Sequence, residues 1–569
     1  MQLLSSMKAS TMAQYGTLYL DGYYAGSTAG GGTFTWLTAE QASGLTPDGG
    51  VVIAPSDHTA DCEEGCLVRQ FSGPLNVKWF GAEGNSNGVT GHDDSSNIQA
   101  TFTAAAARQT GVNFPASSGC YLVTQALTFT SYAPINMEAS GSGICATGTG
   151  YTVLTITTGR DFQAEWNMYV SGPGGFINTG NTNPLDGIVW TNPEGVVGGQ
   201  IRVNGFYGRC LYISDGYDDH FDSISVEDCG NPNANEYAFN LAAVSNTTNQ
   251  TSISRLQVEK AYCQAINVDP TDINLLIENI HSEQAQDCAG LTTYWLGGSR
   301  STYVNARIEA PAAAPSIVFY GSNTSYVNLF LGSTVAAKIR PNGSGDTCWL
   351  QFVGPLIGGT MIGYTNNTCT AMFDQGSVTN LATNVLQIVA NGTNFGTLAI
   401  DNHAYISEYE NAVRCYGCKI GTLSQDGSTS SSGIKLVNSI VEAVTSLPNR
   451  TWVESTEIDG NVTIASNVGL QMDANSVVTG NIAYAGGVLK IRNSQVLGNL
   501  SYTSGTNIWS FVNAHVSGTV DSNFGNIPVS SSQFGIGETS DNPIYTSGQP
   551  SGWRFFGTTT GWKPLANYP

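Results

Sequence analysis

The sequence has few charged residues. Asp, Glu, Lys and Arg make up only 11% of its 569 residues, against about 25% in a typical soluble protein. The charge is also unbalanced, with 43 acidic and 21 basic residues and a formal net charge of −22. Because nucleic-acid binding requires clustered Lys and Arg against phosphates, this composition argues against a nucleic-acid partner. It is compatible with a neutral sugar polymer, whereas an anionic polymer would need a local basic patch.

Several other signals are missing. No run of about 18 apolar residues occurs, so we expect no membrane-spanning helix and no membrane insertion. Residues 1–14 lack the basic start and apolar run of a signal peptide, so synthesis in the cytosol is the simplest interpretation. No Gly-x-Ser-x-Gly elbow with ordered triad partners, no Walker loop and no dinucleotide fingerprint is found. We therefore expect neither a serine nucleophile nor a bound cofactor.

The 12 cysteines lack the paired spacing of a zinc site. Cys62 and Cys66 form one close pair, and Cys415 and Cys418 form another, but neither has a second pair at a suitable distance. We expect buried free thiols inside the turns rather than a metal site.

The residues that are abundant indicate an all-β protein with a large core. The chain contains 67 glycines, 41% hydrophobic residues and 10% aromatic residues. Many short β-branched runs alternate with Gly or Asn turns, which is typical of strands joined by tight turns.

Four glutamates recur in the same short pattern, in which two apolar positions precede a carboxylate. The steps between them are 32, 24 and 26 residues, which is typical of a solenoid with one such strand per turn. In a strand, the two apolar side chains point inward and the carboxylate points outward. Stacked turns would place the glutamates in a column, about 4.8 Å apart per layer. The four segments are Ile224–Glu227, Leu256–Glu259, Ile280–Glu283 and Ala306–Glu309.

This column is the best candidate for catalysis. Hydrolysis of a glycosidic bond needs two carboxyl groups, about 5–5.5 Å apart for retention and about 6.5–9.5 Å apart for inversion. Neighbouring and alternate turns supply these two ranges, and crowding would raise one pKa, as a catalytic acid requires. We predict Glu283 as the acid, with Glu259 or Glu309 as its partner and His281 beside it, and Glu227 as a secondary candidate. The alternative is that these glutamates are ordinary solvated surface.

Aromatic and basic residues near the column are candidates for sugar binding. Tyr294 and Trp295 follow Glu283, and Tyr303 precedes Glu309. Sugar rings stack on aromatic rings through their apolar faces, although a position in the core or at a subunit interface is an alternative for each ring. Arginines in this region can pair with the acids or grip an anionic sugar; they are Arg202, Arg209, Arg255, Arg300 and Arg307.

A second acidic cluster lies at residues 215–222, with the sequence Asp-Gly-Tyr-Asp-Asp-His-Phe-Asp. It lacks the spacing of a calcium-binding loop. Three interpretations are a plain turn, part of a polysaccharide groove and a metal site, in decreasing order of preference. Asp219 and Asp222 are secondary catalytic candidates, and Tyr217 is a candidate substrate contact.

The chain divides into five predicted segments. Residues 1–75 read as a small β module, 76–345 as the main solenoid with the groove, 346–390 as a transition, 391–525 as a slimmer solenoid and 526–569 as a C-terminal cap.

Ile98, Phe102 and Ala105 fall on one face of a helix that Asp93 or Asp94 can cap, and this helix would close the end of the solenoid. The slimmer solenoid shows Gly-Asn or Gly-Thr pairs at steps of 20, 18 and 20 residues, where each Gly would take an unusual φ and each Asn or Thr would stack in a ladder. The pairs begin at Gly460, Gly480, Gly498 and Gly518.

One segment resembles a known family. The run VKWFGAEG, then DDSSNIQATFTAA, then VNFPASSGCYLV, over residues 77–123, is similar to the opening of pectate-lyase-superfamily β-helices. The Gly-rich module before it resembles the small domain that precedes the β-helix in bacteriophage tailspikes, and residues 221–230 resemble a tailspike rung. The family pattern GDGVTDD is lengthened here to residues 84–94, which we expect to form a loop.

The resemblance implies a right-handed parallel β-helix that forms a homotrimer on a virion tail, attached to other tail or baseplate proteins. It also implies binding, and often cleavage, of a bacterial surface polysaccharide outside the cell. The main alternatives are a polysaccharide lyase, with His281, His220, a Tyr or an Arg as base, and an adhesin that binds sugar without cleaving it. A bacterial pectinase-like enzyme is a weaker alternative.

Overall fold

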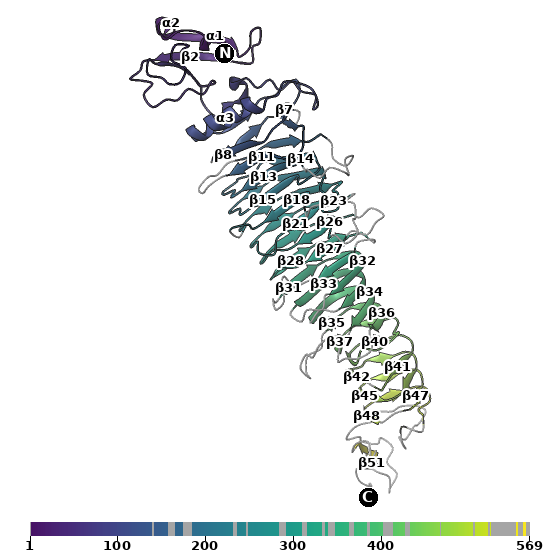
Figure 1. The fold of residues 1–569 in the computed structure, drawn as a ribbon. Helices are drawn as coiled ribbons and strands as arrows, with labels where there is room; N and C mark the ends of the chain where they lie inside the picture. The colour runs from purple at the N-terminus through teal and green to yellow at the C-terminus, as the bar shows by residue number, and fades with distance from the viewer. Residues whose placement is uncertain are drawn as a thin grey trace. The chain divides into compact units, whose positions relative to one another are not determined.

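The structure is a computed structural model that divides into two compact units, Met1–Ser301 and Thr302–Pro569. We describe each unit by itself (Figure 1). The residues that the structure describes are 2–131, 133–138, 142–157, 165–173, 185–231, 236–245, 248–283, 292–309, 316–332, 336–339, 348–363, 369–383, 387–401, 413–426, 433–466, 468–504, 507–521, 524, 553–555 and 562–564.

The first unit begins with a small antiparallel sheet, within the predicted N-terminal module. Two helices that were not expected from the sequence, α1 (Gln2–Ser5) and α2 (Ala9–Tyr15), bury Leu4 and Met12 in a cluster with Phe34 and Leu67. In spatial order the strands are β1 (Thr17–Gly22), β2 (Gly30–Leu37), β4 (Cys66–Arg69) and β3 (Val52–Ile53).

The predicted capping helix is present as α3 (Ser95–Arg108), which follows a short 3-10 turn, η1 (Val77–Phe80). Its buried face includes Ile98, Phe102 and Ala105, as the periodicity indicates. The Phe102 ring lies 4.8 Å from Phe129 on β8 (Leu127–Thr130), so the helix covers the first strands of the solenoid. Asp94 occupies the N-cap position, but its carboxylate accepts hydrogen bonds from the N–H groups of residues 83 and 84 instead.

The rest of the first unit is a parallel β-helix, which confirms the predicted fold. Consecutive strands belong to different ladders, and each strand pairs in parallel with the equivalent strand one turn later. The first ladder, ladder A, contains β7 (Tyr121–Val123), β10 (Ile144–Ala146), β12 (Met168–Ser171), β14 (Gln200–Phe206), β17 (Ser223–Cys229), β20 (Leu256–Glu259) and β23 (Ile280–Glu283).

Two further sets of strands complete the turns. Ladder B contains β8, β11 (Thr152–Thr157), β13 (Asp186–Thr191), β15 (Leu211–Ser214), β18 (Phe239–Ala242), β21 (Ile266–Val268) and β24 (Tyr294–Leu296). The third side contains β5 (Leu75–Asn76), β6 (Val112–Phe114) and β9 (Ile135–Met137), and later β16 (His220–Phe221), β19 (Ser252–Ile253) and β22 (Leu276–Glu278).

The second unit is built in the same way. Its first ladder contains β25 (Thr302–Val304), β28 (Thr324–Val327), β31 (Cys348–Val353), β33 (Cys369–Thr383), β34 (Gln387–Asp401), β35 (Val413–Tyr416), β37 (Gly433–Val437), β39 (Arg450–Glu454), β42 (Gly469–Asp473), β45 (Gly487–Arg492) and β48 (Asn507–Val512).

Its second ladder shares the long strands β33 and β34. The other members are β26 (Arg307–Ile308), β29 (Phe330–Leu331), β32 (Leu356–Gly363), β36 (Lys419–Asp426), β38 (Ile440–Val441), β40 (Glu457–Ile458), β43 (Val477–Val478), β46 (Gln495–Val496) and β49 (His515–Val516). On the third side lie β27 (Ser316–Phe319), β30 (Ala336–Ile339), β41 (Val462–Ile464), β44 (Ile482–Tyr484) and β47 (Leu500–Tyr502).

The Gly-Asn repeat of the second unit forms the predicted side-chain ladder. The side-chain oxygen of Asn461 accepts a hydrogen bond from the backbone N–H of Asn481 at 2.8 Å, Asn481 accepts from Asn499 at 2.7 Å, and Asn499 accepts from Thr519 at 2.8 Å. The explanation for the glycines needs a correction, since only the first of the four, Gly460, has a positive φ. The later three are required because a Cβ would collide with the backbone of the preceding turn.

The expected free thiols are a second correction. Cys62–Cys66, Cys120–Cys145, Cys210–Cys229 and Cys348–Cys369 are disulfides, and Cys263 is also disulfide-bonded. Cys415 and Cys418 are the free cysteines among the described residues, and both are buried. For Cys120–Cys145 and Cys348–Cys369 the expectation failed because a separation of about one turn brings the two cysteines to neighbouring turns, whereas Cys62 and Cys66 are only four residues apart.

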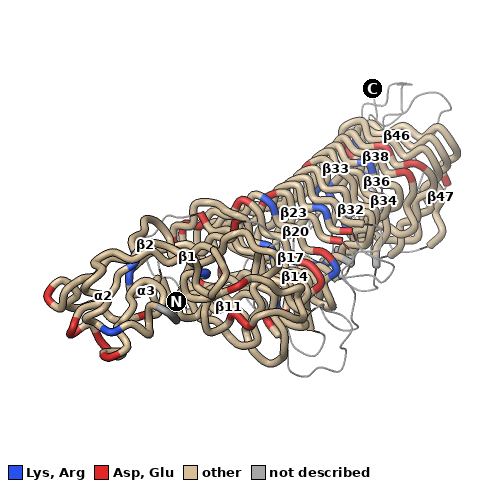
Figure 2. Tube along the Cα trace, turned by 90° about the horizontal axis from the view of Figure 1, so that it is seen from above, with Lys and Arg blue, Asp and Glu red and all other residues tan. Residues whose placement is uncertain are grey.

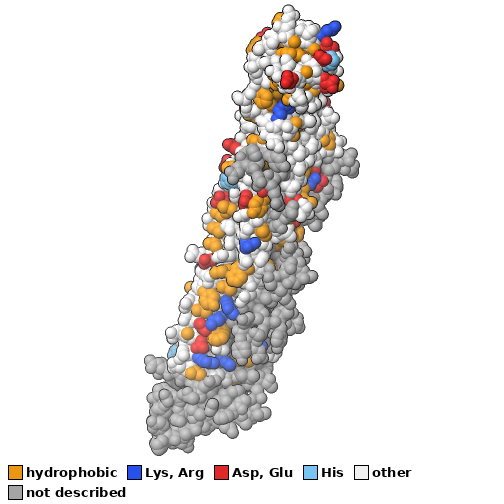
Figure 3. Space-filling model, turned by 90° about the vertical axis from the view of Figure 1, so that its left-hand side faces the viewer, with side chains coloured by type: hydrophobic (Ala, Val, Ile, Leu, Met, Phe, Trp, Pro, Cys, Tyr) orange, Lys and Arg blue, Asp and Glu red, His pale blue; other side chains and the backbone are white. Residues whose placement is uncertain are grey.

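The remaining predicted segments are described in part. The predicted transition, 346–390, contains β31, β32 and β33 in parallel pairing. Most of the predicted cap, 526–569, lies outside the described residues, apart from the antiparallel pair β50 (Trp553–Phe555) and β51 (Trp562–Pro564). Among the described helices, none has the length and apolar character needed to cross a membrane. Figure 3 shows one face of the molecule, on which charged side chains are scattered among hydrophobic ones.

Candidate functional site

Three of the four predicted glutamates form a column on ladder A. Glu227 is the register partner of Glu259, and Glu259 is the register partner of Glu283. Two residues of each segment are buried before the half-exposed carboxylate, as the pattern predicts. Glu309 is half-buried in the second unit and is therefore described apart from the other three. We call Glu227, Glu259 and Glu283 the glutamate column.

Each carboxylate of the column has its own polar partner. Glu227 pairs with Lys260 at 2.5 Å, and this contact raises the pKa of the Lys260 ammonium. Glu259 accepts a hydrogen bond from the side-chain amide of Gln257, and Glu283 lies 3.9 Å from the imidazole of His281. These partners offset the repulsion between like charges that stacking would otherwise cause. Figure 2 shows acidic and basic positions together along β14, β17, β20 and β23.

A second row of outward side chains runs beside the column on the same strands. Arg202, Ser225, Gln257 and His281 occupy equivalent positions on β14, β17, β20 and β23. The predicted closeness of His281 and Glu283 is therefore confirmed, because both lie on the outward face of β23. From β17 to β23 the face presents carboxylates in one row and hydrogen-bonding side chains of Ser225, Gln257 and His281 in the next.

A pocket of about 270 Å³ lies on the same ladder, before the column begins. Its lining includes Tyr169 and Ser171 of β12 and Arg202 and Asn204 of β14. Asn204 is the register partner of Glu227, so the pocket is continuous with the row that carries the carboxylates. We call this the Arg202 pocket.

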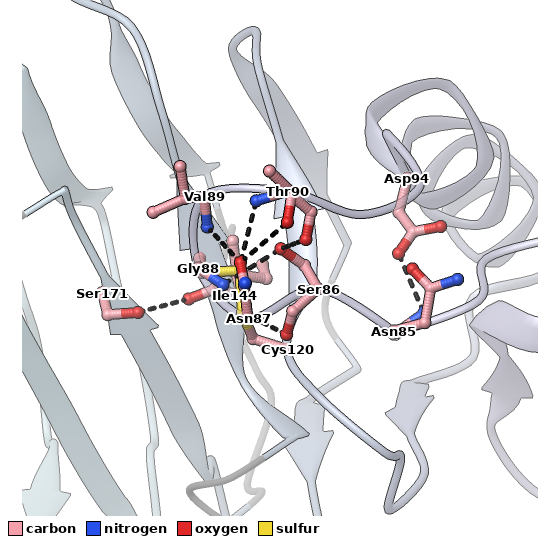
Figure 4. The surroundings of a disulfide bond; sticks show 12 residues. Asn85, Ser86, Asn87, Gly88, Val89, Thr90, Asp94, Cys120, Ile144 and Ser171 are labelled. Atoms are coloured by element: carbon pink, nitrogen blue, oxygen red, sulfur yellow. Dashed lines mark hydrogen bonds between the residues drawn. A yellow bond between two sulfur atoms is a disulfide. The ribbon is translucent and has the colours of Figure 1, made fainter.

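The wall of the Arg202 pocket is held by a disulfide and by the lengthened loop at residues 84–94. Cys120, which lines the pocket, is bonded to Cys145, and its N–H donates to the carbonyl of Ser86 at 3.0 Å. The loop is held by its own side chains, since Asn87 accepts hydrogen bonds from residues 89 and 90. Figure 4 shows this loop beside the disulfide, with the Ser171 hydroxyl donating to the carbonyl of Ile144.

Two predicted sugar-binding aromatic residues are core residues instead. Tyr294 is fully buried, and its hydroxyl is 3.0 Å from the buried Ser282 hydroxyl. Tyr303 is also fully buried and stacks on Tyr326, with ring centroids 5.0 Å apart. Neither ring can contact a polysaccharide, so both assignments were wrong. Their side chains point inward because the strands alternate and these positions fall on the apolar side.

The other predicted substrate contacts are accessible but do not join the column. Trp295 is half-buried on ladder B, and its side chain hydrogen-bonds to Tyr237. Tyr217 is exposed on the third side of the first unit. Arg307 belongs to the second unit, where it pairs with Glu309 and lies over the Phe330 ring. Their roles in binding stay predictions.

The acidic cluster at residues 215–222 serves mainly to hold neighbouring turns. Asp215 accepts hydrogen bonds from the N–H groups of Val244 and Ser245. Asp222 accepts from the N–H of Gly199 and contacts His220, whose other ring nitrogen lies 2.8 Å from the Ser252 hydroxyl. These contacts favour the plain-turn interpretation over the metal site. Among the described residues, no group of three or more His, Cys, Asp or Glu side chains is arranged to hold a metal ion.

Two of the buried aspartates in the first unit have a strongly raised pKa. Asp219 is 1% exposed, and burial raises the pKa of its carboxyl to about 7. Asp272 is fully buried, and burial raises the pKa of its carboxyl to about 8, although the neighbouring Thr248 opposes the change. Because Asp219 cannot reach a polymer outside the β-helix, it is not a catalytic residue, which corrects the secondary assignment.

A larger cavity, of about 730 Å³, lies between residues 44–48 and the outer face of α3. Its charged lining residues, Arg108 and Asp48, pair with each other at 2.5 Å. The column and the Arg202 pocket are formed by strands that do not line this cavity. Since its charges are already paired, the candidate site taken further is the outward face of ladder A.

The Arg202 pocket was missed in the sequence although a signal for it exists. Ile201, Val203 and Asn204 repeat the apolar-x-apolar-polar pattern of the glutamate segments, one turn earlier and with Asn in place of Glu. A search for the pattern without the requirement for a carboxylate would have extended the row to Asn204. The pocket itself could not be found this way, because its depth depends on the neighbouring turn.

No family model and no curated protein matches the chain. Solved structures with a similar fold include the enzymatically active domain of tailspike protein 2 of bacteriophage CBA120, at 11% identity and a TM-score of 0.30, covering 83% of this chain and 62% of that one. Another is WceF of Pantoea stewartii, described as a glycan biofilm modifying enzyme with a tailspike-like parallel β-helix fold, at 14% identity and a TM-score of 0.29, covering 67% and 44%. A third is PfbA, a surface adhesin of Streptococcus pneumoniae, at 12% identity and a TM-score of 0.29, covering 77% and 92%.

Phage tailspike proteins with a parallel β-helix are thus among the structures that resemble this chain. The chain spans less than two thirds of the first two structures. At these identities and TM-scores the likeness says nothing about function, and one fold can serve both binding proteins and enzymes. The function is therefore argued below from the residues of ladder A.

Proposed function

We propose that this chain is a tailspike-type depolymerase that binds and hydrolyses a bacterial surface polysaccharide, such as a capsule, an O-antigen or an exopolysaccharide. The observation that carries the proposal is the in-register stacking of Glu227, Glu259 and Glu283 on one exposed strand face. The resemblance of residues 77–123 to pectate-lyase-superfamily β-helices supports it.

Glu259 and Glu283 are the favoured catalytic pair. Their strands are neighbours, so the two backbones are about 4.8 Å apart. Side chains that extend in parallel from such strands can bring their carboxyl groups to the distance of about 5–5.5 Å that retaining glycosidases use. In this scheme Glu283 protonates the leaving oxygen and Glu259 is the nucleophile. In the second step water hydrolyses the glycosyl-enzyme bond to Glu259, and the Glu283 carboxylate takes the proton from that water, which restores both residues. The nearby His281 contacts Glu283 and helps to orient its carboxyl. Glu227 lies one strand further away and is held by Lys260, so it is the weaker candidate.

The test is to incubate the protein with a panel of purified capsules and to measure product mass and new reducing ends. Glu283→Gln should reduce the rate by about three orders of magnitude, the loss expected when a general acid is removed. Glu278→Gln is the matched control, since that residue lies on β22 outside ladder A. An unchanged rate in Glu283→Gln would reject the catalytic assignment, and binding without any cleavage would identify an adhesin.

A polysaccharide lyase is the second candidate. The observation that favours it is that His281 lies on the outward face of β23 beside Glu283, because a lyase needs a base next to the proton that it removes. A lyase would release an unsaturated sugar that absorbs in the ultraviolet, whereas a hydrolase would not. The two chemistries are therefore separated by the absorbance of the products.

We also propose that the chain acts as a homotrimer on a virion tail, attached to other tail or baseplate proteins and acting on the bacterial surface. The tailspike resemblance supports this assembly. Exposed apolar side chains in the second unit also support self-association, since the register partners Phe330 and Leu356 are 37% and 53% exposed. Sedimentation equilibrium measures the assembly directly, and a monomer at micromolar concentration would refute it.

A further inference from the structure

We propose that the Arg202 pocket binds the acidic sugar of a negatively charged polysaccharide. This inference rests on the proposed function and names its substrate class. The pocket combines an aromatic ring, a guanidinium, a side-chain amide and a hydroxyl on two neighbouring strands, from Tyr169, Arg202, Asn204 and Ser171. At about 270 Å³ it is just below the usual lower size of ligand pockets, about 300 Å³, which suits one sugar unit rather than a length of polymer.

Arg202 is a cation without a protein partner. Its side chain is exposed, and across the described part of the chain neither a hydrogen bond nor an ion pair engages it. Two arginines of the same region of the sequence are paired: Arg209 contacts Asp186 at 2.9 Å, and Arg307 contacts Glu309. In a chain with 43 acidic and only 21 basic residues, an unpaired guanidinium in a pocket is available for an anionic ligand.

The chemistry of the pocket fits a carboxylated sugar. A guanidinium binds a carboxylate through two parallel N–H donors, a geometry that lysine does not provide. The Asn204 amide adds a further donor on the same strand, and the Tyr169 ring offers an apolar face on which a sugar ring can stack. A neutral sugar would leave the guanidinium without an anionic partner.

The position of the pocket sets where the polymer lies. Asn204 is separated from Glu283 by three strand spacings along ladder A, or about 14 Å. Because the carboxylates of the glutamate column repel an acidic sugar placed directly over them, such a sugar is favoured in the Arg202 pocket. This places an uncharged part of the chain over Glu259 and Glu283 and thereby selects the bond that is cleaved.

The test is binding to a panel of purified bacterial capsules that contain uronic acids, each with its carboxyl-reduced form. The full-length protein carries Glu283→Gln so that the polymer stays intact, and affinity is measured by calorimetry. Arg202→Gln should weaken binding of an acidic capsule about ten- to a hundredfold, as expected for a lost charge-assisted hydrogen bond. Arg202→Lys should lose less affinity than Arg202→Gln. Reducing the carboxyl groups of the capsule should weaken its binding to the protein with Arg202 by about the same factor as Arg202→Gln does. On the reduced capsule, Arg202→Gln should then have no further effect.

Arg450→Gln is the control, since it removes an exposed arginine from the second unit. The proposal is overturned if none of the acidic capsules binds, if Arg202→Gln weakens native and reduced polymers equally, or if Arg450→Gln has the same effect. Failure of the proposed hydrolase looks different: the acidic capsule then binds through Arg202, yet the protein with Glu283 intact releases no fragments.

Discussion

Replacing Asp272 with asparagine should stabilise the protein at alkaline pH and leave its stability at pH 4 nearly unchanged. Asp272 is fully buried, and neither of its carboxylate oxygens has a close, well-aligned hydrogen-bond donor among the described residues. Burial raises the pKa of this carboxyl from its ordinary value of 3.8 to about 8. The folded protein therefore holds a proton that the unfolded chain has already lost at pH 6 or 7.

The sign follows from proton linkage. Between the unfolded and folded pKa values the folded state binds more protons, so stability is greatest below about pH 4 and is lost as pH rises toward about 8. The folded and unfolded pKa values differ by about four, and each unit corresponds to about 1.4 kcal/mol. The ionisation of Asp272 therefore lowers the free energy of unfolding by at most about 6 kcal/mol. At pH 6 the loss is about half of that amount. Asparagine does not titrate, so the variant avoids the loss.

The assay is the thermal unfolding midpoint, followed by circular dichroism from pH 4 to pH 9 at one heating rate. A gain of about 3 kcal/mol corresponds to an increase in Tm of about 2–3 °C in a chain of this size. Asp218→Asn is the control, because that aspartate is exposed two turns away in the same side of the solenoid. If the difference in Tm between Asp272→Asn and the parent protein is the same at pH 4 and pH 9, the carboxyl is not protonated in the folded state and the reasoning is refuted.

Three further changes test the packing of the solenoid. Asn481→Ala should lower the free energy of unfolding by about 1 kcal/mol, since the Asn499 N–H loses its acceptor; unchanged denaturant midpoints would show that the side-chain ladder contributes nothing. Gly498→Ala should cost about 1–3 kcal/mol, because the new Cβ meets the Gly480 backbone; this is checked in the same denaturation series, where an equal or higher midpoint contradicts it. Replacing both Cys120 and Cys145 with serine should lower the free energy of unfolding by about 3.5 kcal/mol, the loop-closure value for a 25-residue separation; a denaturant midpoint equal to that of the parent protein under oxidising conditions would contradict this.

The register of the glutamate column could be read from the sequence because two physical constraints agree. Alternation in a strand fixes Ile224 and Val226 as inward and Glu227 as outward. A parallel solenoid then repeats the same position in every turn, so Glu259 and Glu283 follow. The Gly-Asn pairs of the slimmer solenoid were predictable for the same reason, since their period is nearly constant.

The direction of the aromatic side chains was harder to predict. The buried Leu296 lies two residues after Tyr294, so alternation alone indicates that both point inward. Tyr303 stands in a strand of three residues, Thr302–Val304, which is too short for its own sequence to fix the direction. There the orientation depends on Tyr326 in the next turn, which stacks on it.

The disulfides and the Arg202 pocket depend on contacts between turns. With 12 cysteines the pairing cannot be deduced from sequence alone. Cys120 and Cys145 become neighbours because their separation matches one turn, which requires the length of that turn to be known. Arg202 likewise becomes part of a pocket only when β12 and β14 are placed side by side.

The asparagine ladder at Asn461, Asn481 and Asn499 gives the slender end of the molecule a modular construction. In each of these turns the Asn side-chain oxygen accepts a hydrogen bond from the backbone N–H of the corresponding residue in the next turn. A tandem duplication or an in-frame deletion of one such module, about 20 residues long, leaves each new junction chemically identical to the old ones. Natural variants of this stretch should accordingly differ in length by complete modules, while insertions of a few residues should be confined to the corners between strands.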